Sequence, residues 1–181
     1  MDDSPAVTDG VTVSRRHGLT AVLLITAVVV IGVDQLSKYL AVRDLTENVP
    51  VTVISGVLQL RLIRNSGAAF SLATGSTWLF TVIATVVSVV IVRISRRLGS
   101  RWWALALGLL LGGAVGNLLD RLLRAPGFGR GHVVDFIEYL KFPFIAFPIF
   151  NLADSCIVSA ACVIAVLGLL GIAIDGTRVS G

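Results

Sequence analysis

Asp135 and Asp154 are the residues of this sequence whose surroundings best suit catalysis. Both carboxylates stand among aromatic and aliphatic residues, and Asp154 opens a long apolar run. Because a charged group beside the apolar part of a membrane is costly, such a residue usually has a function. Two carboxylates placed close together acquire separated pKa values, so that one is a base while the other is an acid. Such a pair could activate a water molecule without a metal ion.

Further polar residues stand near the ends of apolar runs. Asp34 and Lys38 are four residues apart with the acid first, the favourable order for an ion pair on a helix. They could be a self-neutralised pair at the membrane interface, or Asp34 could point into a helix bundle. Asn117, Asp120 and Arg121 share one helix face. They could support a site, or Asp120 and Arg121 could simply pair with each other at the helix end.

Two segments could hold the aspartates in place. Asn151 suits the N-cap of the last apolar run and would put Asp154 at the third helical position, where the helix N-terminus stabilises a carboxylate. Asp154 could therefore also be an ordinary first-turn acid. Asn65 begins a segment of small residues that contains Gly67 and runs to Ser71. Its backbone could approach another chain closely, or it could be a tight connection into the next helix.

The sequence contains no visible set of metal ligands. Cys156 and Cys162 are six residues apart in the last apolar run, so they do not share a helix face, and we interpret both as small core or lipid-facing residues. His132 could be a base, but we assign it to a loop because two aspartates already suffice. We expect neither a metal nor a cofactor.

The composition is typical of a membrane protein. Hydrophobic residues make up 55% of the chain and charged residues 14%, with a mean hydropathy of +0.89. Soluble domains carry about 25% charged residues. The net charge of +4 comes from basic residues scattered between apolar runs rather than gathered on one face, which argues against nucleic acid and favours a membrane surface as the partner.

Four apolar runs are long enough to cross a bilayer. The first could be a secretory signal, but it is long, has no small-residue cleavage site and is followed by three more runs. The third contains Gly108, Gly112 and Gly116, a spacing that lets another helix pack closely. The expected transmembrane helices are residues 19–40, 77–94, 102–121 and 151–174.

The segments outside these spans are predicted as follows. Residues 1–18 are a polar tail without regular structure, and residues 177–181 form a second short tail. Alternating apolar residues around Ser55–Gly56 predict a β-hairpin within residues 51–62. Apolar residues at helical spacing predict a short amphipathic helical segment at the interface over 133–140. The predicted fold is thus an all-α polytopic membrane protein with one domain, residues 19–176, that carries a small β-hairpin.

Four spans in series bring the candidate site residues to one side of the membrane. The ends of spans one and three and the beginnings of spans two and four share that side. The opposite side receives both tails and the loop Arg93–Arg101, whose arginine density suggests that it is cytoplasmic. The residues brought together are Asp34, Lys38, Asn65, Asn117, Asp120, Arg121, Asp135, Asn151 and Asp154.

Two other classes of protein could use some of these features. A proton- or ion-coupled transporter would explain intramembrane acids, but it would need them near the middle of the membrane. A scaffold that binds partner helices would explain the glycines of the third span, but not the paired acids. We therefore favour a membrane peptidase.

Five sequence blocks resemble the signature blocks of lipoprotein signal peptidase, also called signal peptidase II. They occur in that family's order and cover most of the chain from the first span onward. The N-terminal tail and the Gly/Pro-rich connection from Arg121 to Val133 depart from the family pattern. The blocks are DQLSK at 34–38, NSGAAFS at 65–71, GGAVGNLLDR at 112–121, VVDFI at 133–137 and FNLAD at 150–154.

The resemblance implies an aspartic endopeptidase of the bacterial inner membrane with both termini cytoplasmic and the active site near the outer leaflet. Its substrates would be prolipoproteins whose cysteine carries diacylglycerol, cut just before that cysteine, and it would work as a monomer among membrane lipids. Asp135 and Asp154 match the family's catalytic pair. The supporting positions are Asp34, Lys38, Asn65, Gly67, Asn117, Asp120, Arg121 and Asn151.

Overall fold

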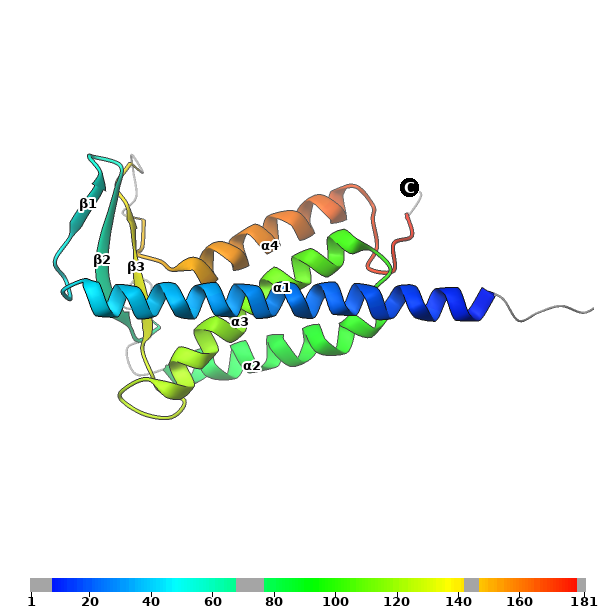
Figure 1. Cartoon of the computed structure of the whole chain (residues 1–181), viewed down its shortest axis with the longest axis horizontal. Helices are drawn as coiled ribbons and strands as arrows, with labels where there is room; N and C mark the ends of the chain where they lie inside the picture. Colours follow the sequence, from blue (N-terminus) through cyan, green and yellow to red (C-terminus); the bar gives the residue numbers. More distant parts are fainter. Residues whose placement is uncertain (1–7, 68–76, 142–146, 179–181) are drawn as a thin grey trace, which may run out of the picture.

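Four helices and a three-stranded sheet make up the chain. The computed structural model describes residues 8–67, 77–141 and 147–178. All four helices are long and apolar enough to cross a membrane. The elements are α1 (Thr8–Asp44), β1 (Val51–Ile54), β2 (Leu58–Asn65), α2 (Thr77–Ile94), α3 (Arg101–Leu123), β3 (Val133–Tyr139) and α4 (Leu152–Leu169) (Figure 1). A short 3₁₀ helix, η2 (Ser95–Arg97), lies in the connection from α2 to α3.

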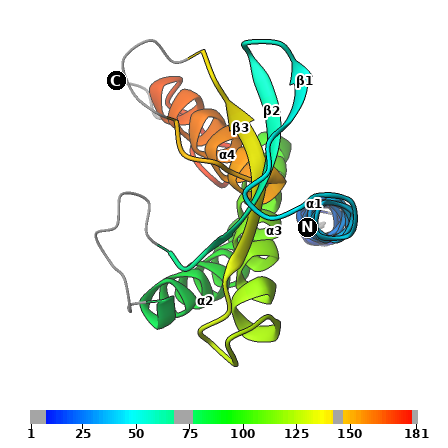
Figure 2. The ribbon, with the colours of Figure 1, turned by 90° about the vertical axis from the view of Figure 1, so that its left-hand side faces the viewer.

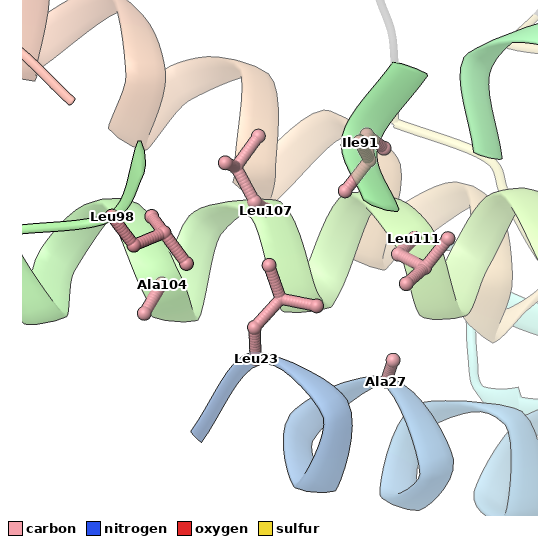
Figure 3. Close-up of a cluster of buried hydrophobic side chains, with 7 residues drawn as sticks. All are labelled: Leu23, Ala27, Ile91, Leu98, Ala104, Leu107 and Leu111. Atoms are coloured by element: carbon pink, nitrogen blue, oxygen red, sulfur yellow. The ribbon is translucent and has the colours of Figure 1, made fainter. Parts of the chain in front are cut away.

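Helix α3 is the centre of the bundle. Half of its apolar stretch is buried inside the chain, compared with 17% or less for the other three helices. It packs against α1, α2 and α4. Its Leu107 and Leu111 meet Leu23 and Ala27 of α1 and Ile91 of α2 in the main buried cluster (Figure 3). The outer sides of the other helices keep their apolar residues exposed, as a lipid environment allows.

The glycine stripe of α3 is the contact surface for α1. A Cβ atom added at Gly108 would lie 2.7 Å from the Cβ of Thr26, and one at Gly112 would lie 2.6 Å from the Cβ of Val30. Small residues are needed where two helix backbones approach this closely. The predicted packing role of the glycines is confirmed. Their partner is α1 of the same chain, so this stripe is not open to the partner helices of a scaffold.

The sheet lies across the end of the bundle where α1 and α3 finish (Figure 2). Its strand order is β1–β2–β3 and both pairings are antiparallel. The predicted hairpin is confirmed, with Gly56 in its turn at a φ of +66°, which glycine adopts without strain. Strand β3 lies far from β2 in sequence but pairs with it from Leu58 to Asn65, so it joins the hairpin to the helices.

The predicted helical segment over 133–140 is wrong, because Val133–Tyr139 is a strand. Its first four residues are all buried, a pattern that suits a strand covered on both faces as well as a helix. The backbone N–H groups of Phe136 and Ile137 donate to the carbonyl of Phe150. The other edge pairs with β2. Both partners are distant in sequence, so periodicity within the segment could not reveal them.

Several helix boundaries also differ from the prediction, most of all the start of α1 and the end of α4. α1 begins at Thr8, so residues 8–18 of the predicted tail are helical. Once a helix has formed, it extends readily at its end. α4 ends at Leu169, not near 174, because Gly171 adopts a φ of +64° and Ile172 forms a bridge with Arg178. The bounds of α2 match the prediction. Residues 1–7, 68–71, Pro143 and 179–181, on which predictions were also made, lie outside the described residues.

Replacing Gly112 by alanine is expected to push α1 and α3 apart. The new methyl group would meet Val30 at 2.6 Å and the carbonyl oxygen of Ala27 at 2.9 Å. Overpacking of this kind costs about 1–3 kcal/mol. Gly32→Ala is the matched control, because nothing lies within 4 Å of its added Cβ. Thermal unfolding in detergent should show a lower Tm for Gly112→Ala alone; equal values would contradict the close approach of the two helices.

Candidate active site

The structure brings the predicted site residues together at the sheet end of the bundle (Figure 1). The carboxyl-terminal ends of α1 and α3, the last residue of β2, the first half of β3 and the start of α4 all meet there. The residues linked by the hydrogen bonds and ion pairs described below are Asp34, Lys38, Asn65, Asn117, Asp120, Arg121, Asp135, Asn151 and Asp154.

Asp135 is almost completely enclosed, with 1% of its surface exposed. Its Oδ2 accepts a hydrogen bond of 2.8 Å from the amide Nδ2 of Asn65, and its Oδ1 accepts one of 2.6 Å from Nδ2 of Asn151. Burial raises the pKa of Asp135 to about 7, and the negative charge of Asp154 contributes, although the two amide donors act in the opposite direction. This carboxyl group therefore exchanges a proton near neutral pH.

Asp154 occupies a different environment at the start of α4. Its backbone N–H donates to Oδ1 of Asn151, and its own Oδ2 accepts from the backbone N–H of Asn151 at 3.2 Å. This is the predicted N-cap in the form of a capping box. Its Oδ1 accepts a 2.8 Å hydrogen bond from Nδ2 of Asn117. Backbone donors at a helix N-terminus favour the charged form of a carboxylate.

Asn151 is the residue that contacts both aspartates. Its amide nitrogen donates to Asp135 while its backbone and Oδ1 bind Asp154. The same amide nitrogen also lies 3.1 Å from Oδ1 of Asn117. Asn151 is fully buried, so these contacts are shielded from water. Asn151 therefore holds the Asp135 carboxylate with its side-chain amide and the Asp154 carboxylate with its backbone N–H.

Lys38 is fully buried beneath this pair and fills all three of its donor positions. Its ammonium group lies 2.8 Å from Oδ2 of Asp34, 3.0 Å from Oδ2 of Asp120 and 2.9 Å from Oδ1 of Asn117. The last contact requires the amide nitrogen of Asn117 to face Asp154. The predicted Asp34–Lys38 pair is thus confirmed, and it points into the bundle rather than toward the interface.

The two carboxylates around Lys38 also hold the neighbouring elements. Oδ1 of Asp34 accepts from the backbone N–H of Ala153 at 3.0 Å, at the start of α4. Oδ2 of Asp120 accepts from the backbone N–H of Val134 at 3.1 Å, in β3. Each aspartate therefore ties one of the catalytic elements to the bundle.

The expected alternative in which Asp120 pairs with Arg121 is wrong. Asp120 Oδ1 binds Arg124 at 2.6 Å instead, one helical turn further on. The reason is geometric, because residues i and i+4 of a helix share a face and adjacent residues do not. With Arg124 included, two cations and two carboxylates balance in this cluster.

Arg121 faces the catalytic side of α3. Its guanidinium lies 5.5 Å from the centre of the Phe80 ring, and its Nη1 donates to the carbonyl of Asn117 at 3.3 Å. The residue is buried, yet its Nε has no hydrogen-bond partner among the residues that the structure describes. An unpaired buried donor is costly, so this nitrogen is available for a further acceptor.

Gly67 adopts a φ of +107°, and a Cβ atom there would lie 2.6 Å from the ring of Phe80. Only glycine fits such a position without strain. Its backbone N–H donates to Oδ1 of Asn65 at 2.8 Å. That contact orients the Asn65 amide so that its nitrogen faces Asp135.

Sequence reasoning missed two members of the buried cluster. Gln35 donates from Nε2 to the carbonyl of Gly116 at 3.0 Å and lies 3.2 Å from Asp34. Arg124 pairs with Asp120, as described. The spacing of four residues between Asp120 and Arg124 could have revealed the second, since the same rule predicted Asp34 and Lys38. Nothing in the local pattern around Gln35 indicates its partners on α3.

A groove of about 550 Å³ opens beside the two aspartates. Asp135, Asp154 and Asn65 form its polar part, and aromatic and aliphatic side chains line most of the remainder. An apolar groove with a few convergent polar groups is the usual form of a ligand site. Its lining residues include Phe147, Pro148, Ile149, Phe150, Ser155, Val158 and Ser159.

A membrane-spanning bundle that directs two carboxylates of unlike environment into an apolar groove has the parts of an aspartic peptidase. The charges gather at one end of the bundle and are held by ion pairs, which does not suit a transport pathway through its middle.

Comparison with known proteins gives the family. The model of the signal peptidase II family matches residues 26–170. The lipoprotein signal peptidase of Rhodococcus jostii is 49% identical over 180 residues, covering 98% of this chain and 86% of that protein. That of Mycolicibacterium smegmatis is 50% identical over 175 residues, covering 97% and 72%. The chain therefore belongs to the signal peptidase II family.

A solved structure has the same fold. A bacterial membrane enzyme determined by the in meso method at 1.9 Å resolution superposes with a TM-score of 0.71 and 31% sequence identity. The match covers 81% of this chain and 92% of that one. Most of this chain thus has the fold of an experimentally solved membrane enzyme.

The pKa of Asp135 predicts a pH-dependent stability. The folded protein keeps a proton on Asp135 up to a pH of about 7, whereas the unfolded chain releases it near 3.8. This group therefore stabilises the fold fully at low pH and loses that contribution as the pH rises from about 4 to about 7, by up to roughly 4 kcal/mol. In Asp135→Asn, the fall of Tm between pH 5 and pH 8 in detergent should be smaller than in the wild type. An unchanged fall would contradict the raised pKa.

Lys38→Met is expected to destabilise the bundle strongly. It would leave the buried carboxylates of Asp34 and Asp120 without the cation they share, and loss of one partner of a buried ion pair costs about 3–5 kcal/mol. Lys141→Met is the matched control, because Lys141 is exposed. Chemical unfolding in detergent should separate the two variants clearly. Equal stabilities would show that the Lys38 cluster does not hold the bundle together.

Proposed function

We propose that this protein removes signal peptides from bacterial prolipoproteins, with Asp135 and Asp154 as its catalytic residues. The observation that carries the proposal is the pair itself, two carboxylates that line one groove and are joined through Asn151. Their environments differ as the acid and the base of a hydrolytic pair must differ. Membership of the signal peptidase II family supports the same reaction.

The two environments assign the two roles. Asp154, which accepts hydrogen bonds from Asn151 and Asn117, acts as the base and takes a proton from water as the water oxygen attacks the scissile carbonyl carbon. Asp135, with a pKa of about 7, is the protonated acid, which donates a hydrogen bond to the carbonyl oxygen. The amine leaves with a proton from the pair as the C–N bond breaks. Both carboxyl groups then return to their starting states.

Asn117 and Arg121 have positioning roles in this mechanism. Asn117 is held by Lys38 and directs its amide nitrogen to Asp154. The Nε of Arg121, unpaired among the described residues, could donate to a carbonyl of the substrate backbone. Asn65 keeps Asp135 in place from the β2 side. The family resemblance implies supporting positions for these residues, without assigning a role to each.

The substrate is a prolipoprotein with a diacylglyceryl cysteine, cut just before that cysteine. Support comes from the relatives, which are named lipoprotein signal peptidases. The aromatic side of the groove, with Phe147 and Phe150 in edge-to-face contact, suits a substrate that carries apolar chains. All residues of the proposed mechanism come from a single chain, which is consistent with a monomer surrounded by membrane lipids.

The proposed orientation places the active site near the outer leaflet of the inner membrane, with both chain ends cytoplasmic. Four spans put both ends on one side, together with the loop that joins α2 to α3. That loop region carries Arg93, Arg96, Arg97 and Arg101. Arginine-rich short loops usually remain in the cytoplasm.

The test is cleavage of a diacylglyceryl prolipoprotein by the purified protein in detergent. Asp135→Asn and Asp154→Asn should each lower the rate by about 10²–10⁴-fold or more, the usual contribution of a general acid or base. Asp44→Asn is the matched control, because Asp44 is exposed at the same end of the bundle and pairs with Arg43. Wild-type activity in either dyad variant would disprove its role. Absence of cleavage by folded wild type would disprove the function.

A further inference from the structure

One face of α4 connects two separate grooves. The active-site groove is lined by Asp154, Ser155, Val158 and Ser159 of this helix. A second groove, of about 340 Å³ and almost entirely apolar, lies nearer the other end of the bundle and extends to Trp102 of α3. Its α4 residues follow the first set at helical intervals, so both sets lie on one stripe. We call this stripe the outer face of α4, formed by Val158, Ser159, Cys162, Val163, Val166 and Leu170.

The outer face of α4 has no partner among the described parts of the chain. Val158 is 62% exposed, Val166 53% and Leu170 59%. The opposite side of the helix, with Ala153 and Ala160, is completely buried. Figures 1 and 2 both place α4 at the edge of the bundle.

Two observations indicate what covers this face. It is continuous with the catalytic groove, so a chain whose peptide bond lies at Asp154 can extend directly along it. Its length from Asp154 to Leu170 is about 24 Å at 1.5 Å per residue. The apolar region of a signal peptide has about 7–15 residues, which gives a helix of about 10–22 Å. Ser155 and Ser159, near the catalytic end, would let the two backbones approach closely.

We propose that the outer face of α4 binds the apolar helix of the substrate's signal peptide, with its N-terminus toward Trp102 and its cleavage site at Asp154. This inference rests on the proposed function. It identifies α4 as the element that distinguishes a substrate helix from surrounding lipid.

A third groove, also apolar, serves as a comparison for the grooves on α4. It lies between α1 and α2, has a volume of about 410 Å³ and is lined by Leu24, Val28, Ser88 and Val89 among others. Its apolar character is similar, but no residue of the proposed catalytic pair lines it. Lipid would fill the grooves on α4 and between α1 and α2 alike, whereas a signal peptide held at Asp154 lies next to the face of α4.

Cys162 offers a direct probe of this proposal. It is exposed on the outer face of α4, and Cys156 is the only other cysteine of the chain. Cys162 is eight residues from Asp154, which is about 12 Å along the helix axis. A substrate segment covers that distance with about four extended or eight helical residues. Contact with Cys162 is therefore expected four to eight residues before the cleaved bond.

The experiment is disulfide cross-linking in membranes. The protein carries Cys156→Ser, so that Cys162 is its only thiol, and Asp135→Asn, so that substrate is retained. Single cysteines are scanned from 2 to about 16 residues before the cleaved bond of a diacylglyceryl prolipoprotein, a range that includes the whole apolar region of a signal peptide. Cross-linking should peak at positions four to eight. The control protein lacks both native cysteines and carries Val89→Cys, and it should give no peak.

Other outcomes would overturn the inference. Three results would show that the outer face of α4 does not bind the signal peptide. They are a cross-linking peak in the Val89→Cys protein, equal yields at all substrate positions, and a Cys162–Cys162 dimer that forms without substrate. Kinetics separates this inference from the proposed function. If wild type cleaves the substrate, Val166→Trp should raise KM by about tenfold, the effect of losing roughly one interhelical contact, while Val89→Trp should not. If the wild type, Val166→Trp and Val89→Trp all cleave the substrate with equal KM values, the proposed docking surface is wrong while the proposed reaction still stands.

Discussion

The ammonium group of Lys38 is the interaction on which the rest of the site depends. It is fully buried between Asp34 of its own helix and Asp120 of α3. Each of these carboxylates accepts a further hydrogen bond from a backbone N–H, at the start of α4 and in β3. Electrostatic contacts are strong in such a dry interior, and an uncompensated charge would be very costly there. One buried cation thus holds together β3 and α4, the two elements that carry Asp135 and Asp154.

The two aspartates differ because they stand on different kinds of element. Asp135 lies on a strand enclosed by the sheet and the helices, and desolvation raises its pKa to about 7. Asp154 lies in the first turn of α4, where it forms a capping box with Asn151. Asn151 contacts both. Secondary structure and burial thus place two chemically identical side chains in different environments.

Much of this arrangement was predictable from local patterns. Four apolar runs of membrane length, the glycines of the third run, the N-cap at Asn151 and the Asp34–Lys38 spacing each depend on residues near one another in sequence. Such patterns report helices reliably, because a helix satisfies its backbone within one segment. Counting the spans then placed the polar residues on one side before any contact was known. The five sequence blocks that resemble signal peptidase II identified the chemistry.

The sequence by itself determined the four apolar spans and the gathering of the polar residues at one end of the bundle, since these follow from hydropathy and helix geometry. Only the tertiary structure decided that 133–139 is a strand, because its hydrogen-bond partners in β2 and at Phe150 are distant in sequence. It also decided that Asp120 of α3 binds Lys38 of α1. Partners across elements are chosen by packing and by the requirement that every buried charge be paired, and no local spacing contains that information.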